Sequence, residues 1–468
     1  MIGMDYYWFT VLHILISSLL TFHILLIKSN VRSAIGWMGI VWFSPYLGSL
    51  IYYFFGINRI ARRAKNIGYA RKHVASLSTK AKYKLVDLPG YLEPIAQITT
   101  SEITFGNTLE VLRSGDKAYP EMLSAISAAT SEIVLQMYIF RNDRIGVMFR
   151  DALIAAHSRG VEVRILVDGI GSGYFFSSIV FELQKAGIPA YRFIHFWAPW
   201  RMTYLNLRNH KKLLIIDNKI GYVGGMNLGG ENVLTKYRDR MVNDTHFKIK
   251  GPIVQYLTSI FDQDWQFTTG KLSTDKEGKP EARGSGKAIA RCIASGPDED
   301  GEIIETIFSM AILSAREKIR IVTPYFLPDT RLVAFLQMAM LRGVEIELII
   351  PQKTDLFFMD WAMNGHLPFL KNKNLKCYRS PPPFDHSKLL TIDGNWCAFG
   401  SPNWDARSMR LNFEILIECY DVGSVKILDA LIDEKRDQAQ LFKIETLSKR
   451  NLAIRLRDAF ARLFLPYV

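Results

Sequence analysis

The sequence contains few cysteines, and none of them are spaced to hold a metal together. The 468 residues include only Cys292, Cys377, Cys397 and Cys419. No pair has the two-residue spacing of a zinc or redox motif, and four cysteines in a chain this long are not a disulfide framework. We therefore expect reduced, buried thiols and a cytosolic setting for the folded body.

Charge is missing from two stretches near the N-terminus, residues 6–27 and 33–58. A hydrocarbon core of about 30 Å needs roughly 20 apolar residues in a helix, so each stretch is long enough to span a membrane. No basic residue precedes the first stretch, which argues against a secretory signal. We expect two transmembrane helices within residues 1–58, forming a hairpin. The alternative is a buried helical hairpin in a soluble protein.

Acidic residues are missing from the next segment. Between Arg59 and Val86 the chain has nine basic residues and no acid. The positive-inside rule then places both this segment and the N-terminus in the cytoplasm. The net charge of +13 suggests an anionic partner, either a nucleic acid or an anionic membrane. Together with the two spans, it favours membrane lipids over nucleic acid.

The remainder of the chain contains an internal repeat. A helix ending at Ala129 or Ala315 leads into a strand at 133–140 or 319–326. A second helix at 146–158 or 331–341, a glycine cap at Gly160 or Gly343, and a near-continuous apolar strand at 161–167 or 344–350 follow in the two halves. This order predicts two duplicated α/β lobes. The expected segments are a juxtamembrane linker at 59–99, lobes at 100–267 and 288–446 joined by a linker at 268–287, and a basic amphipathic helix at 447–468.

One short pattern occurs once in each half of the repeat. His210, Lys212 and Asp217 have the spacing H-x-K-x4-D and precede Gly-Gly and Asn227; His386, Lys388 and Asp393 repeat it and precede Gly400, Ser401 and Asn403. One copy occurs by chance in roughly one chain in thirty of this length and composition, but two equivalent copies are far rarer, on the order of one in a thousand. The pair therefore predicts a shared site.

These residue types suit a phosphodiester. On a strand, residues two apart project from the same face, so each histidine accompanies its lysine. An ammonium can bind a non-bridging oxygen, while an imidazole attacks phosphorus or protonates the leaving oxygen. Asn227 and Asn403 can donate to the same oxygens, and Ser401 is a further candidate for substrate binding. The Gly-Gly pair at 224–225 and the Gly-Ser pair at 400–401 allow the backbone to turn tightly. We expect no metal or other cofactor, because lysines and amides supply the positive charge.

A nucleophilic imidazole needs an acceptor on its other nitrogen. Asp244 and Glu414 are the candidates for this supporting role. Asp217 and Asp393 lie seven residues beyond their histidines, on the opposite strand face, and we expect them to be structural.

The paired motifs resemble those of the phospholipase D superfamily. With the two N-terminal stretches, the strings RNHKKLLIID, GGMN, HSKLLTIDG and GSPNWDARSMRLNFE are similar to bacterial cardiolipin synthases over nearly the whole chain. The resemblance implies a multi-pass protein of the bacterial inner membrane with its catalytic part in the cytoplasm. It implies transfer of a phosphatidyl group from one phosphatidylglycerol to another through a phosphohistidine, with release of glycerol. It makes His210 the nucleophile and His386 the acid and base, an order that the spacing does not fix.

Two departures from the family pattern concern the site. Lys211 stands where arginine is common, and residues 230–243 lack the tryptophan usually found near Asp244. Two alternatives stay open: a hydrolase of the same superfamily, in which water accepts the phosphatidyl group, and a membrane-anchored lipid-binding scaffold. The sequence does not predict the oligomeric state.

Two further segments bear on lipid contact. Residues 192–208 alternate aromatic and basic side chains and suggest an interfacial lip, with Arg208 near phosphate; a packed loop is the alternative. In the C-terminal segment, Leu452, Leu456, Phe460 and Leu463 share one helical face. That face either contacts a membrane or packs on the protein.

Overall fold

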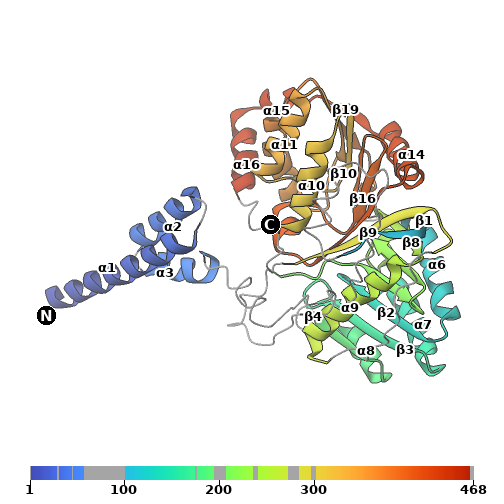
Figure 1. Cartoon of the computed structure of the whole chain (residues 1–468). Helices are drawn as coiled ribbons and strands as arrows, with labels where there is room; N and C mark the ends of the chain where they lie inside the picture. Colours follow the sequence, from blue (N-terminus) through green and yellow to red (C-terminus); the bar gives the residue numbers. More distant parts are fainter. Residues whose placement is uncertain are drawn as a thin grey trace. The chain divides into compact units, whose positions relative to one another are not determined.

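The chain is described by a computed structural model with two compact units, the N-terminal helices and a larger α/β body (Figure 1). The described residues are 2–28, 31–44, 46–56, 101–173, 177–193, 207–235, 241–271, 284–296 and 302–463. The basic segment from Arg59, most of the aromatic lip and most of the inter-lobe linker lie outside these ranges.

The N-terminal unit has one helix long and apolar enough to cross a membrane. This is α1 (Ile2–Ile27), within which residues 7–27 meet that criterion. The second expected span is divided into α2 (Val31–Phe43), α3 (Leu47–Ile51) and the π-helix η1 (Tyr52–Gly56). The sequence has a proline at position 45, and proline lacks the amide hydrogen that a continuous helix requires. No second helix among the described residues meets that length and apolarity criterion, so the expected hairpin of two spanning helices is not confirmed.

Polar side chains join α1 to the helices that follow it. Ser17 Oγ donates to the carbonyl of Val41 at 3.2 Å, and Trp42 Nε1 donates to Thr21 Oγ1 at 2.9 Å. His23 Nδ1 lies 2.9 Å from the Tyr52 hydroxyl. In an apolar setting these pairs satisfy groups that would otherwise be costly to bury. Most other side chains of α1 face outward, as a lipid-facing helix requires.

The body is built on a 15-stranded mixed sheet in the order β19-β13-β12-β10-β15-β16-β18-β9-β1-β8-β6-β5-β2-β3-β4. From β1 outward, the first half uses β1 (Thr104–Arg113), β8 (Thr245–Lys250), β6 (Ile220–Gly224), β5 (Leu213–Ile216), β2 (Glu132–Met137), β3 (Glu162–Asp168) and β4 (Ala190–Phe193). From β9 outward, the second uses β9 (Ala288–Ser295), β18 (Glu414–Cys419), β16 (Trp396–Gly400), β15 (Leu389–Ile392), β10 (Lys318–Val322), β12 (Glu345–Pro351), β13 (Leu375–Ser380) and β19 (Gln440–Phe442).

Strand order and direction correspond between the two halves. The β2–β3–β4 and β10–β12–β13 sets are parallel, and the strands that carry or follow each motif are antiparallel. The halves meet where β1 pairs antiparallel with β9. The expected strands at 161–167 and 344–350 are confirmed within one residue at each end. Gly160 and Gly343 have φ of 90° and 96°, the left-handed conformation of a glycine cap.

Helices cover both faces of each half of the sheet. One core lies under α6 (Ser114–Ala128), α7 (Arg144–Ser158) and α8 (Ser178–Lys185), and another under α10 (Ile303–Ser314), α11 (Thr330–Leu341) and α12 (Phe357–His366). A third core contains residues of both halves, including α9 (Ile253–Thr269) and α14 (Val422–Gln438). There Phe247 stacks on Phe399 with ring centroids 3.8 Å apart. The two halves therefore share a continuous apolar core.

Shorter elements complete the body. They are β7 (Val242–Asn243), β11 (Phe326–Leu327), β14 (Phe384–Asp385), β17 (Trp404–Asp405), α13 (Ala406–Arg410), α15 (Glu445–Ser448), α16 (Leu452–Leu463) and the 3-10 helices η4 (Gly230–Asn232) and η5 (Leu367–Leu370). The four cysteines are free and buried, as expected.

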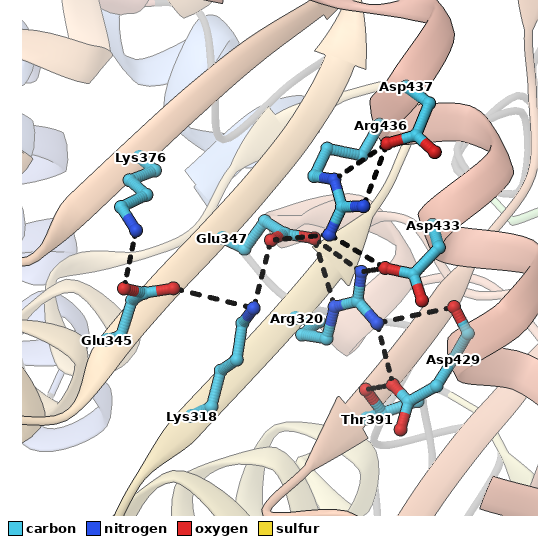
Figure 2. Close-up of polar contacts among 10 residues, drawn as sticks. All are labelled: Lys318, Arg320, Glu345, Glu347, Lys376, Thr391, Asp429, Asp433, Arg436 and Asp437. Carbon is cyan, nitrogen blue, oxygen red and sulfur yellow. Dashed lines mark hydrogen bonds and ion pairs between the residues drawn. The ribbon is translucent and has the colours of Figure 1, made fainter. Parts of the chain in front are cut away.

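Charged side chains tie α14 to the second half of the sheet (Figure 2). Arg320 on β10 bonds to Glu347 on β12 at 2.8 Å and to Asp433 on α14 at 2.6 Å. In the first half, Arg164 on β3 bonds to Asp262 on α9 at 2.7 Å. Partly buried arginine–carboxylate pairs of this kind fix the relative orientation of the elements they join more than they add to the stability of the fold. They join α9 to β3 and α14 to β10.

Candidate active site

Each motif histidine lies just before a short buried strand that ends at the motif aspartate. His210 and Lys212 precede β5, and His386 and Lys388 precede β15. All four side chains are largely buried: His210, Lys212 and Lys388 are 8%, 0% and 5% exposed, and the side chain of His386 is 13% exposed. The apolar strand packs in the core, and the histidine and lysine of each motif lie immediately before its N-terminal end.

The carboxylates that support the histidines come from opposite halves of the chain. Nδ1 of His210 lies 3.0 Å from Glu414 on β18, and Nδ1 of His386 lies 2.8 Å from Asp244 beside β8. If each carboxylate accepts the Nδ1 proton, Nε2 keeps the lone pair needed for attack or proton transfer. Asp244 and Glu414, expected as supporting acids, therefore lie where that role needs them.

Backbone contacts hold this crossed arrangement. The amide of His210 donates to the carbonyl of Phe413 at 2.9 Å, next to Glu414. The amide of His386 donates to the carbonyl of Asn243 at 2.7 Å, next to Asp244, where β7 pairs with β14. Each histidine is thus fixed to the residue preceding its carboxylate.

Further hydrogen bonds orient Glu414. Its carboxylate is fully buried and accepts from Ser401 Oγ at 2.5 Å and from Asn412 Nδ2 at 3.0 Å. Burial opposes ionisation, but His210 and Lys212 hold the pKa of Glu414 below its usual value. Ser401 was expected to bind substrate; its hydroxyl instead contacts the supporting carboxylate.

Glycine at position 225 leaves room for Asp244. A Cβ at this position would lie 2.5 Å from Asp244 Oδ1. The Gly-Gly pair was expected to allow a tight turn. At Gly225 the requirement is space for the buried acid, whose pKa is lowered by Lys388 and His386 against the effect of burial.

Each lysine contacts the histidine of its own motif. Nζ of Lys388 lies 3.2 Å from Nε2 of His386, and Nζ of Lys212 donates to the carbonyl of His210 at 2.7 Å. Burial lowers the pKa of Lys388 to about 8 and that of Lys212 well below its usual value. Each lysine also lowers the pKa of the other half's histidine, which places all four groups within electrostatic range.

Burial favours the neutral form of both histidines. Burial lowers the pKa of His210 to about 4, although Glu414 opposes the change. Burial and Lys388 likewise lower the pKa of His386. An arriving phosphodiester brings a negative charge, which favours the protonated form of a nearby imidazole.

Asp217 and Asp393 lie at the other ends of the motif strands. Asp217 accepts from the amides of Thr130, Ser131 and Glu132, where β2 begins, at 2.7–3.2 Å. Asp393 accepts from the amides of residues 316–318 at 2.7–2.9 Å, where β10 begins. Both make the turn contacts expected of a structural residue.

The two motif asparagines, Asn227 and Asn403, make different hydrogen bonds. Asn227 uses Oδ1 to accept from the Ile139 amide at 3.2 Å, which leaves Nδ2 as its donor. Asn403 bonds through its side chain to Asp405, whose pKa burial raises to about 6. The buried Oδ1 of Asn403 has no hydrogen-bond partner among the described residues. Asn227 therefore uses its amide oxygen to contact the protein, whereas the side chain of Asn403 bonds to Asp405.

The site includes aromatic and basic residues that the motif did not predict. Tyr138 packs edge-on against His210 at 4.9 Å, and Tyr325 against His386 at 6.3 Å. The strings MYIF and PYFL contain these tyrosines at corresponding positions of the two halves, so the sequence alone could have identified them as a pair. Arg208 lies beside Tyr138, and its charge contributes with burial to lowering the pKa of Arg407.

The residue between histidine and lysine is structural in both halves. Lys211, where arginine is common, is fully buried and bonds to Asp264 on α9 at 2.7 Å. Its counterpart Ser387 bonds to Thr245 Oγ1 at 2.9 Å. Neither residue projects with the histidine, as strand alternation predicts.

Comparison with known proteins identifies the family of the chain. Residues 122–265 and 309–436 match the family model described as "Cardiolipin synthase, PLD-like domain". The chain belongs to the cardiolipin synthase family. Residues 15–56 match a second model, "Phospholipase_D-nuclease N-terminal".

Members of this family resemble the chain over almost its full length. A cardiolipin synthase of Geobacillus sp. (strain WCH70) is 31% identical, with 97% of this chain and 93% of that protein aligned. Cardiolipin synthase 1 of Bacillus cereus is 29% identical, over 96% and 91% of the two chains. The crystal structure of phosphatidylserine synthase from Haemophilus influenzae has a TM-score of 0.64 at 13% identity, covering 81% of this chain and all of that one. This last likeness supports a phospholipase D-like α/β fold.

Proposed function

We propose that this chain is a membrane-bound cardiolipin synthase that works through a phosphohistidine on His210. The reaction converts two phosphatidylglycerols to cardiolipin and glycerol. The observation that carries the proposal is the crossed pairing of His210 with Glu414 and of His386 with Asp244. It gives one phosphodiester two oriented imidazoles, one for each of the two bonds that change.

In the first step, Nε2 of His210 attacks phosphorus and the bond to the glycerol oxygen breaks. His386 gives its proton to that oxygen, and glycerol leaves. Lys212, Lys388 and the Nδ2 donor of Asn227 bind the non-bridging oxygens, where charge develops. Glu414 stabilises the positive charge that forms on His210.

In the second step, His386 acts as the base. It removes the proton from the free headgroup hydroxyl of a second phosphatidylglycerol, whose oxygen attacks phosphorus. The phosphorus–nitrogen bond breaks, which releases cardiolipin and restores neutral His210. The proton gained by His386 replaces the one given to glycerol, so the site returns to its starting state.

An anionic substrate fits the protonation that the first step needs. With Lys212 and Lys388 protonated, their charges equal those of the ionised Asp244 and Glu414, so the site with neutral histidines has no net charge. A phosphodiester adds one negative charge and raises the pKa of both histidines. His386 then gains its proton when there is a leaving oxygen to receive it.

We also propose that the body arose by duplication, with lobes at 100–267 and 288–446 related by a pseudo-twofold axis. The corresponding strand orders support this. For the membrane, we propose a multi-pass N-terminal region, with α1 spanning and residues 31–56 returning as a broken helix. The basic residues from Arg59 support a cytoplasmic body.

The test uses the full-length chain in vesicles of phosphatidylglycerol labelled in the headgroup. The expected products are free glycerol and cardiolipin. Phosphatidic acid as the sole lipid product would overturn transfer in favour of hydrolysis. His210→Ala should leave no covalent phosphatidyl adduct after acid quench, whereas His386→Ala retains one. His157→Ala, on α7 and outside the site, is the control, and an adduct that survives His210→Ala would reverse the assignment.

A further inference from the structure

The C-terminal helix α16 packs on the body with its apolar stripe facing outward. Leu452, Leu456 and Leu463 are 68%, 61% and 66% exposed, and Phe460 between them is 61% exposed. At 100° per residue these four positions fall within about 80° of the helix circumference. Single exposed leucines are ordinary, but a continuous stripe on one helix marks a surface for interaction.

The opposite face of α16 attaches the helix to the body. Asp458 and Ala461 are buried there, and α16 packs closely along α12. Gly365 on α12 permits this approach, because a Cβ would lie 2.5 Å from the carbonyl oxygen of Asp458. Arg450 and Arg457 bond to the Asp458 carboxylate at 3.3 and 2.6 Å. The outward direction of the leucines is therefore fixed by packing. In Figure 1, α16 is an outer helix of the second half.

Arginines border the stripe on both sides. Arg457 follows it on one flank, while Arg455 and Arg462 lie on the other. The guanidinium of Arg457 lies over the Trp361 ring at 4.5 Å, and that of Arg462 over the Phe369 ring at 4.4 Å. Stacking holds these charges beside the stripe, at the level where lipid headgroups would meet an interfacial helix.

We propose that the α16 stripe docks the catalytic body on an anionic bilayer surface, as a contact separate from the N-terminal helices. An apolar strip flanked by cations complements acyl chains beneath anionic headgroups. A protein partner would need matching acids opposite the arginines, whereas an anionic leaflet presents negative charge along the whole helix. The inference does not depend on the reaction proposed above.

The test measures the depth of α16 in the full-length protein in phosphatidylglycerol vesicles. The native cysteines are buried, so a nitroxide can be placed selectively through Leu456→Cys. Lys426→Cys, on the exposed face of α14, is the matched control. We expect the label at 456 to be accessible to oxygen and shielded from a water-soluble nickel complex. The control label should show the reverse, and phosphatidylcholine vesicles should weaken the contrast.

Two results would overturn the proposal. Equal access of the nickel complex to both labels would mean that the stripe stays in water. Shielding from both reagents would mean that protein covers it. Spin–spin broadening that disappears on dilution with unlabelled protein would then identify the cover as a second copy.

An activity measurement adds a second readout. The triple change Leu452→Ser, Leu456→Ser and Leu463→Ser should reduce turnover of vesicle lipid about tenfold. Turnover of a short-chain, monomeric phosphatidylglycerol should not change, because these side chains lie outside the site. If the parent protein turns over neither lipid, the proposed function fails while the depth measurement still decides the docking. Equal loss on both substrates would contradict docking.

Discussion

Glu414→Gln tests the carboxylate that orients the proposed nucleophile. The substitution preserves side-chain volume and the possibility of contacts with Ser401 and Asn412. It removes the charge that lies 3.0 Å from His210 Nδ1. The amide also offers two orientations to Nδ1, only one of which keeps the lone pair on Nε2. The variant should therefore fold but attack phosphorus slowly.

The size of the effect follows from this one contact. A hydrogen bond to a charged, buried group contributes about 1.5–3 kcal/mol, and each 1.36 kcal/mol changes a rate tenfold. Loss of the charge alone therefore predicts a rate decrease of roughly 10- to 150-fold. Misorientation of the imidazole adds to this, so we expect a total decrease of about 10²–10⁴.

Single-turnover formation of the phosphatidyl adduct is the appropriate assay, because it isolates attack by His210. Ser401→Ala provides a graded comparison: it removes one hydrogen bond to Glu414 and leaves the charge, so its decrease should be smaller. Glu434→Gln, at an exposed site on α14, controls for the loss of a carboxylate. A Glu414→Gln variant that unfolds at the parent's temperature yet forms adduct at more than half its rate would refute the assigned role.

Two further predictions concern charge and stability. Because burial lowers the pKa of Lys388 to about 8, kcat/KM should fall as the pH rises through that value and the ammonium becomes neutral; a flat profile from pH 7 to about 9.5 would contradict this. Asp217→Asn should lower the free energy of unfolding by about 1.5–3 kcal/mol, measured by thermal or denaturant unfolding, while turnover per folded molecule stays near the parent value. The pKa of Asp217 is depressed by backbone amides, so its contribution to stability is present at neutral pH and is lost only in acid. A large loss of turnover without destabilisation would instead mean that Asp217 takes part in the reaction.

The local pattern of the sequence predicted most elements of the body. Apolar periodicity placed the helix at 146–158, which the structure extends only to Arg144–Ser158. It predicted the N-terminal region less well, because counting apolar residues ignored the effect of a proline at position 45. A run of sufficient length thus became three shorter helical pieces.

The site was predictable in its residue types but not in its pairings. Asp244 and Glu414 were identified because an imidazole needs an acceptor, yet spacing along the chain does not show which histidine each one serves. That depends on how β7 meets β14 and how Phe413 meets Asn209, contacts between residues 142 to 204 positions apart. The contacts of Tyr138 and Tyr325 were not predicted, because the spacing of the motif does not show which rings pack against the histidines.

The crossed pairing also explains why one motif alone would not make a working site. Within a single half, the histidine and lysine would still lie at the end of a well-formed strand, but the acceptor for the histidine Nδ1 would be missing. The buried carboxylate left in that half, Glu414 or Asp244, would lose its imidazole partner and carry an uncompensated charge, which is strongly unfavourable in a core. Each half therefore stabilises the other's acid while orienting the other's base. Under the proposed two-step mechanism, loss of either interaction would therefore impair both halves of the site.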